Sequence, residues 1–179
     1  MIEAPFHKPG TIRIWFDEAK PYDFAPGRVV KFEIATQPSA IRRERRVTVE
    51  LVLRRAGLFP YGLLGAAFIP NVSNVLQIEV NCDSQTDVMV LNSLALQPDT
   101  VLIGLPYEYA QAVLNSVAHS DISEQLGSGL IRFDCAAHGE VGSSSSAFVR
   151  LSLIVTQLLT LDVTERSYND IASILTQIE

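Results

Sequence analysis

Residue types that serve nucleophilic catalysis lie close together in the second half of the chain. Asp134 and His138 are four residues apart, and Ser143 begins a run of four serines. The alternation of this segment predicts a strand with Asp134 and His138 on one face. However, no G-x-S-x-G turn is present to expose a serine nucleophile. Hydroxyls in a row suit a helix N-terminus better, because they accept from unpaired N–H groups there. We therefore assign no catalytic residue and favour a non-enzymatic role.

Cysteine and histidine are too sparse to indicate a metal site. The chain has two cysteines, Cys82 and Cys135, and three histidines. Cys135 and His138 form a close pair, but on a strand they point to opposite faces. We expect no metal and no cofactor, and two reduced core thiols in a cytoplasmic protein.

The serine run offers a possible anion site. Gly142 precedes Ser143 and Ser144, and a helix that begins here presents free N–H groups to a phosphate or carboxylate. Capping of the helix by the serine hydroxyls is the simpler interpretation.

A second candidate for anion or RNA binding is a basic run that contains Arg42, Arg43, Arg45 and Arg46. Residues 1–55 carry 11 Lys and Arg against 7 Asp and Glu, whereas residues 56–179 carry 3 against 13, for a net charge of −6. A nucleic-acid-binding protein typically concentrates basic charge on one face. Here the excess is local, so the arginines could equally pair with the acidic half or face solvent.

A third candidate is the apolar stretch from Leu58 to Phe68, which we expect to form a loop between two strands. Its large side chains are Phe59, Tyr61, Leu63, Leu64 and Phe68. If this loop is exposed, it marks a contact with a protein partner or a second copy; if it folds back, it extends the core. Its longest apolar run, residues 61–69, is well short of the ~20 residues of a membrane span. The N-terminus shows no apolar signal segment.

The elements that position these residues follow from hydrophobic periodicity. Alternating residues predict strands over 11–16, 30–34, 47–54, 76–82 and 131–138, and an apolar run predicts a buried strand over 101–105. Period 3.6 predicts helices from Pro106 to Ser120, from the serine run to about Leu158, and over 167–178. Strands with one apolar face favour a mostly antiparallel sheet covered by helices on one face. Residues 17–27 carry prolines and a glycine and predict a hairpin loop.

The second half of the chain also carries short motifs in a characteristic order. They are GLPYEYAQAV at 104–113, GLIRFD at 129–134 and VGSSSSAF at 141–148. This order resembles domain IV of elongation factor G and of the tetracycline-resistance ribosomal protection proteins, over about residues 100–160. The resemblance implies a two-layer α+β sandwich with a left-handed βαβ crossover, and it implies ribosome or RNA association.

The departures from that family bear on function. Gly142 stands where the family has an acid before its serine pair, and the family's tip histidine falls near Gly139. The family's polar, glycine-rich tip loop is replaced by the apolar stretch that contains Phe59. Neither a P-loop nor a G-x-G-x-x-G motif occurs, so the chain is not a translocase.

The sequence thus predicts one α+β domain over 1–179, with an N-terminal hairpin extension (1–40) and a core (41–179) like domain IV. The expected function is non-catalytic binding of a protein partner, or self-association as a homo-oligomer, without a membrane. Ribosome or RNA association is the first alternative, and a small-molecule enzyme on the same fold is the second.

Overall fold

A computed structural model describes residues 1–5, 10–53, 59–83, 88–161 and 168–177. Its strands are β1 (Ile2–Pro5), β2 (Thr11–Phe16), β3 (Arg28–Ala35), β4 (Arg45–Val52), β5 (Tyr61–Pro70), β6 (Val75–Cys82), β7 (Val101–Ile103) and β8 (Gly129–Gly139). Its helices are α1 (Tyr107–Ala118), α2 (Ile122–Leu126), α3 (Ser145–Thr160) and α4 (Tyr168–Gln177). The expected α+β class is confirmed.

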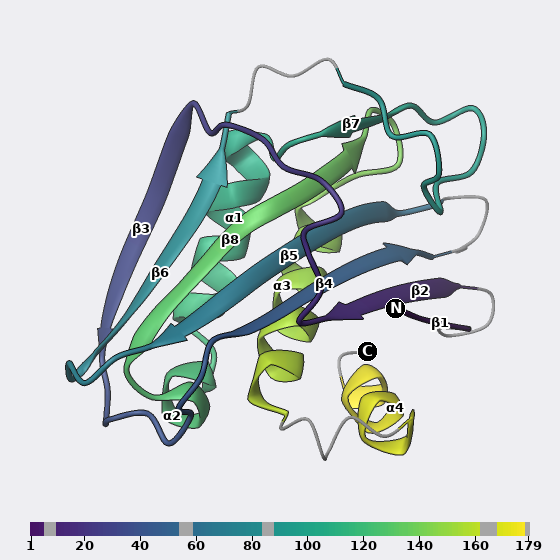
Figure 1. The fold of residues 1–179 in the computed structure, drawn as a ribbon. Helices are drawn as coiled ribbons and strands as arrows, with labels where there is room; N and C mark the ends of the chain where they lie inside the picture. Colours follow the sequence, from purple (N-terminus) through teal and green to yellow (C-terminus); the bar gives the residue numbers. More distant parts are fainter. Residues whose placement is uncertain (6–9, 54–58, 84–87, 162–167, 178–179) are drawn as a thin grey trace.

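The strands form one mostly antiparallel sheet in the order β1-β2-β4-β5-β8-β6-β3, with β7 paired to β8 (Figure 1). The neighbours β6 and β8 are the parallel pair, and α1 and α2 lie between them in sequence. A parallel pair needs such a crossover connection because its strands cannot be joined by a tight turn.

Helices α1 and α3 cover one face of the sheet, which we call the helix face (Figure 1). The large apolar side chains of β5, β6 and β8 that point to this face are fully buried against them. Phe148 on α3 stacks on Tyr109 of α1, with ring centroids 5.0 Å apart. At the start of α3, Ser144 is the N-cap and accepts from the backbone N–H of Ala147, as the serine run predicts.

The opposite face, which we call the open face, carries a smaller apolar cluster and many charges. Cys135 and Tyr61 belong to this cluster, together with Val90 and Val101 from the segment that surrounds β7. The segment over 17–27 also crosses this face, and Phe24 within it is buried (Figure 1).

The predicted N-terminal hairpin is wrong. Strand β2 pairs with β1 and β4, whereas β3 pairs with β6 at the far edge of the sheet. The turn-forming residues of 17–27 therefore serve a long crossing and not a hairpin. Both strands join the main sheet, which supplies the partners that an isolated hairpin lacks.

The predicted apolar loop is also wrong from Tyr61 onward, because residues 61–70 form β5, whereas Phe59 and Pro60 lie outside the strands. This strand lies between β4 and β8, and its first eight residues are buried. A strand with both faces covered shows no alternation of apolar and polar residues. Leu58 of the same stretch lies outside the described residues.

A β-bulge in β8 changes which of its residues share a face. The pairing of β5 with β8 shifts register between Gly65 and Ala66, so Asp134 and Cys135 both belong to the open face. His138 instead lies on the helix face, where its ring contacts Tyr109 edge to face. The expectation that Asp134 and His138 share a face is therefore wrong, since a bulge inverts the alternation beyond it.

Candidate functional site

Three segments far apart in the sequence meet at the end of the sheet where β5 begins. Residues 59–60, 96–99 and 141–144 line a cleft of about 320 Å³, which we call the tip cleft. Phe59 and Val141 on its rim are 42% and 82% exposed. Pro60, Leu96 and Pro98 add apolar walls, and among the described lining residues only Asp99 is charged. Exposed apolar side chains around a concave site are typical of binding surfaces.

Asp99 holds the 141–144 loop in place. Its two carboxylate oxygens accept from the backbone N–H groups of Val141 and Gly142, each at 2.9 Å. A Cβ atom at Gly142 would lie 2.6 Å from Asp99 Oδ2, and one at Gly139 only 2.1 Å away. Both positions therefore require glycine for the carboxylate to approach the backbone.

The two predicted anion-binding serines are occupied by structural hydrogen bonds. The hydroxyl of Ser143 donates to the carbonyl of Tyr61 at 2.8 Å and accepts from the N–H of Gly139 at 2.8 Å. Ser144 caps α3, with its hydroxyl 3.3 Å from the N–H of Ala147. Ser144 thus caps the helix, whereas Ser143 ties the loop to β5 and β8. The anion held by the preceding loop is the chain's own Asp99 carboxylate.

Of the five residues predicted to bind a partner, only Phe59 lies at the tip cleft surface. Tyr61, Leu63, Leu64 and Phe68 are 0–1% exposed in β5 and cannot form a contact surface in this fold. Sequence reasoning missed Val141, Pro98 and Leu96, because the cleft brings together segments that no local pattern connects. The available signal was Val141, an apolar residue in an otherwise polar run before the serines.

The predicted basic run separates into three environments. Arg45 is buried, and its Nη1 donates to the carbonyls of Leu159, Thr160 and Leu161 at the end of α3, at 3.1, 2.7 and 3.0 Å. Arg46 points to the open face and pairs with Asp134. Arg42 and Arg43 are exposed, and Arg43 borders an open cleft that also contains three acidic residues, Asp17, Glu18 and Glu44.

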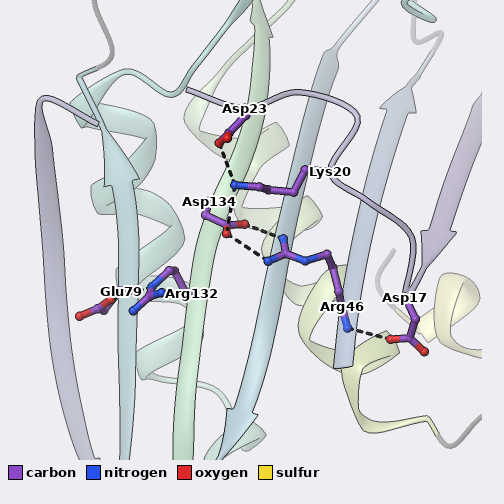
Figure 2. A network of polar contacts seen from close by, with 7 residues as sticks. All are labelled: Asp17, Lys20, Asp23, Arg46, Glu79, Arg132 and Asp134. Atoms are coloured by element: carbon purple, nitrogen blue, oxygen red, sulfur yellow. Dashed lines mark hydrogen bonds and ion pairs between the residues drawn. The ribbon is translucent and has the colours of Figure 1, made fainter. Parts of the chain in front are cut away.

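Charged side chains of the open face form two networks, one around Asp134 and one around Glu79 (Figure 2). Arg46 makes two bonds to Asp134, at 2.7 and 3.1 Å, and Lys20 of the crossing segment lies 3.5 Å from the same carboxylate. On the neighbouring strands, Glu79 accepts from Lys31 at 2.6 Å and from Arg132 at 3.0 Å.

These contacts shift the pKa values of Glu79 and Arg46 in the directions that keep both groups ionised. The hydrogen bond from Lys31, followed by that from Arg132, lowers the pKa of the Glu79 carboxyl. The hydrogen bond to Asp134 raises the pKa of Arg46. Asp134 is therefore engaged as a structural counter-ion and not as the acid of a triad.

The open face also holds a buried carboxylate, Glu50, and a buried thiol, Cys135. The carboxylate is fully engaged in hydrogen bonds, and the thiol is removed from solvent. The carboxylate of Glu50 accepts from the Tyr61 hydroxyl at 3.0 Å and from the Leu94 N–H at 2.7 Å, which ties the 88–101 segment to the sheet. Burial raises the pKa of the Cys135 thiol to about 11, so this cysteine is protonated at neutral pH.

Comparison with family models, with curated proteins and with solved structures found no match. Within the described ranges, no three His, Cys, Asp or Glu residues are grouped so that they could hold a metal ion. The helices of the same part of the chain are all too short or too polar to cross a membrane.

Proposed function

We propose that this protein is a non-catalytic module that binds an apolar side chain of a protein partner in the tip cleft. The observation that supports this most directly is the exposure of Phe59 and Val141 on either side of a cleft with apolar walls. Such a site gains affinity by burying an aromatic or aliphatic anchor.

The charges near the cleft favour a basic partner segment. Asp99 lies in the cleft, and Glu140 is exposed beside Val141. The Asp99 carboxylate already accepts from two N–H groups, but its oxygens have further acceptor capacity. A lysine or arginine next to the apolar anchor would therefore be attracted, and an acidic neighbour would be repelled.

The test is selection of binding peptides from a displayed random library, with the full chain immobilised. We expect enriched peptides to share one large apolar residue next to Lys or Arg. Val141→Asp should abolish binding of these peptides, because it removes an apolar side chain from the cleft, and the apolar anchor would then lie against a carboxylate. Val72→Asp is the matched control: Val72 is 91% exposed in the turn between β5 and β6, outside the tip cleft.

Two outcomes would contradict the proposal. One is that no peptide is enriched, and the other is that enriched peptides bind Val141→Asp as tightly as the unaltered chain. Asp99→Ala gives a second check, because loss of its two hydrogen bonds should loosen the 141–144 loop and weaken peptide binding.

We also propose that the chain shares the topology of domain IV of elongation factor G, including a left-handed crossover from β6 through α1 to β8. The support is the motif order together with the parallel β6–β8 pair and the helices on one face of the sheet (Figure 1). In that comparison the tip cleft occupies the position of the family's tip loops.

Ribosome or RNA association remains the alternative function, with Arg42 and Arg43 as the contact residues. It receives less support, because Arg45 and Arg46 are used inside the fold. Co-sedimentation with ribosomes and bulk RNA over a salt series separates the two functions. Binding that falls steeply with salt and is lost in Arg42→Glu/Arg43→Glu would favour the alternative.

A further inference from the structure

Strand β3 forms an edge of the sheet. Its eight residues pair with β6 along their whole length. Beyond its other side, Figure 1 shows no element among the drawn residues. An edge of this length presents a row of backbone groups that can pair with another strand. At the opposite edge, β1 is only four residues long and is a poorer template.

The side chains of β3 are complementary to those of a second, antiparallel copy of the same strand. Phe32 is 45% exposed, with Val30 and Ile34 on the same face of the strand. On the other face, Lys31 and Glu33 are both exposed. One positive and one negative charge thus flank an exposed aromatic residue.

Among the registers centred on the three middle residues of this surface, Lys31, Phe32 and Glu33, the charges favour one. In an antiparallel pair, residues that lie directly opposite each other point to the same face of the sheet. A two-fold symmetric pair of β3 strands must therefore place one central residue opposite the same residue of the other copy. Centring on Lys31 or on Glu33 places like charges directly opposite each other, which is unfavourable. Centring on Phe32 places Lys31 of each copy opposite Glu33 of the other, Phe32 opposite Phe32, and Val30 opposite Ile34.

We propose that this protein forms a homodimer in which two β3 strands pair antiparallel about Phe32. The two sheets then continue into one another around a two-fold axis, which is the closed symmetry most common in homo-oligomers. Lys31 keeps its bond to Glu79 in the dimer, because an ammonium group has three donors. This inference does not use the tip cleft and stands independently of the proposed function.

The test is a charge exchange measured by sedimentation equilibrium and native mass spectrometry. The unaltered chain should dimerise with rising concentration. Lys31→Glu and Glu33→Lys should each weaken the dimer at least about tenfold, because two attractive pairs become repulsive. An equimolar mixture of the two variants should form heterodimers, since each glutamate then faces a lysine. The double variant Lys31→Glu/Glu33→Lys should again form homodimers.

Controls separate this interface from a change in folding. Glu140→Lys changes the charge as Glu33→Lys does, at an exposed residue outside β3, and should leave the dimer unchanged. Circular dichroism should show that each variant is folded. Because Lys31→Glu also removes the bond to Glu79, hydrogen exchange of the unaltered chain tests the β3 interface without any substitution. Alternate β3 amides should be protected in concentrated samples and exchange on dilution.

Three results would overturn the proposal: a monomer at every concentration, single variants that dimerise like the unaltered chain, or a mixture that stays monomeric. A dimer whose β3 amides exchange equally at all concentrations would also overturn it, since another surface would then form the contact.

Discussion

Arg46 on β4 and Asp134 on β8 form a two-bond ion pair, although β5 lies between their strands. The guanidinium nitrogens lie 2.7 and 3.1 Å from the carboxylate oxygens, and the two side chains are 19% and 11% exposed. The pair bridges β5 where that strand carries the small residues Gly65 and Ala67 (Figure 2). Asp134 is the extra residue of the bulge in β8, and it lies on the same face as Arg132, whereas the alternation is inverted in the residues that follow it.

We expect the two side chains to be strongly coupled in a double-mutant cycle of Arg46→Met and Asp134→Asn. Because the pair is largely buried, removing either partner leaves a charge that has lost solvent and counter-ion, so the coupling should reach about 1–3 kcal/mol. Lys20 limits the cost of Arg46→Met, since it lies near the same carboxylate. Urea unfolding of the four proteins measures the coupling. A value below about 0.5 kcal/mol would place the pair with ordinary surface ion pairs.

Arg45 and Arg42 offer a matched comparison of a buried and an exposed arginine. Arg45 binds three carbonyls at the C-terminus of α3, where a positive charge is stabilised by the helix dipole. Arg45→Met should therefore lower the free energy of unfolding by about 2–4 kcal/mol. Arg42→Met should change it by no more than about 0.5 kcal/mol, as expected for an exposed residue. Equal effects in urea unfolding would contradict this assignment.

The strands and helices with a clear period could be predicted from the sequence. Alternation locates β2, β4 and β6 because each has one apolar face, and the serine run locates the start of α3. Strand β5 could not be found this way, because burial of both its faces removes the alternation.

Long-range pairing was harder to predict than the elements themselves. A turn-rich segment between β2 and β3 favours a hairpin locally, but the pairing of each strand is decided by distant partners. Phe24 was a signal against the hairpin, because a large apolar residue in a hairpin loop would be exposed. In the structure Phe24 belongs to the crossing segment and is buried. At the tip cleft, Phe59 could be predicted from its type, but its neighbours depend on the tertiary fold.

The pH dependence of stability should reveal the network around Glu79. Its carboxyl has a lowered pKa in the folded chain, first through the hydrogen bond from Lys31 and then through that from Arg132. A lowered folded-state pKa contributes stability that is fully present above the unfolded-state value of about 4.5 and is lost as the pH falls through the folded-state value. We therefore expect Glu79→Gln to be less stable than the unaltered chain at neutral pH, with the difference shrinking below about pH 4.5.

Urea unfolding at a series of pH values measures this difference, and Lys31→Met provides the control background. In that background Glu79 keeps only the hydrogen bond from Arg132, so the effect of Glu79→Gln should be smaller and should depend less on pH. A difference that stays constant from neutral to acidic pH would show that the carboxyl titrates alike in the folded and unfolded chain. Lys31 would then leave the ionisation of Glu79 unaffected, despite the 2.6 Å contact between them.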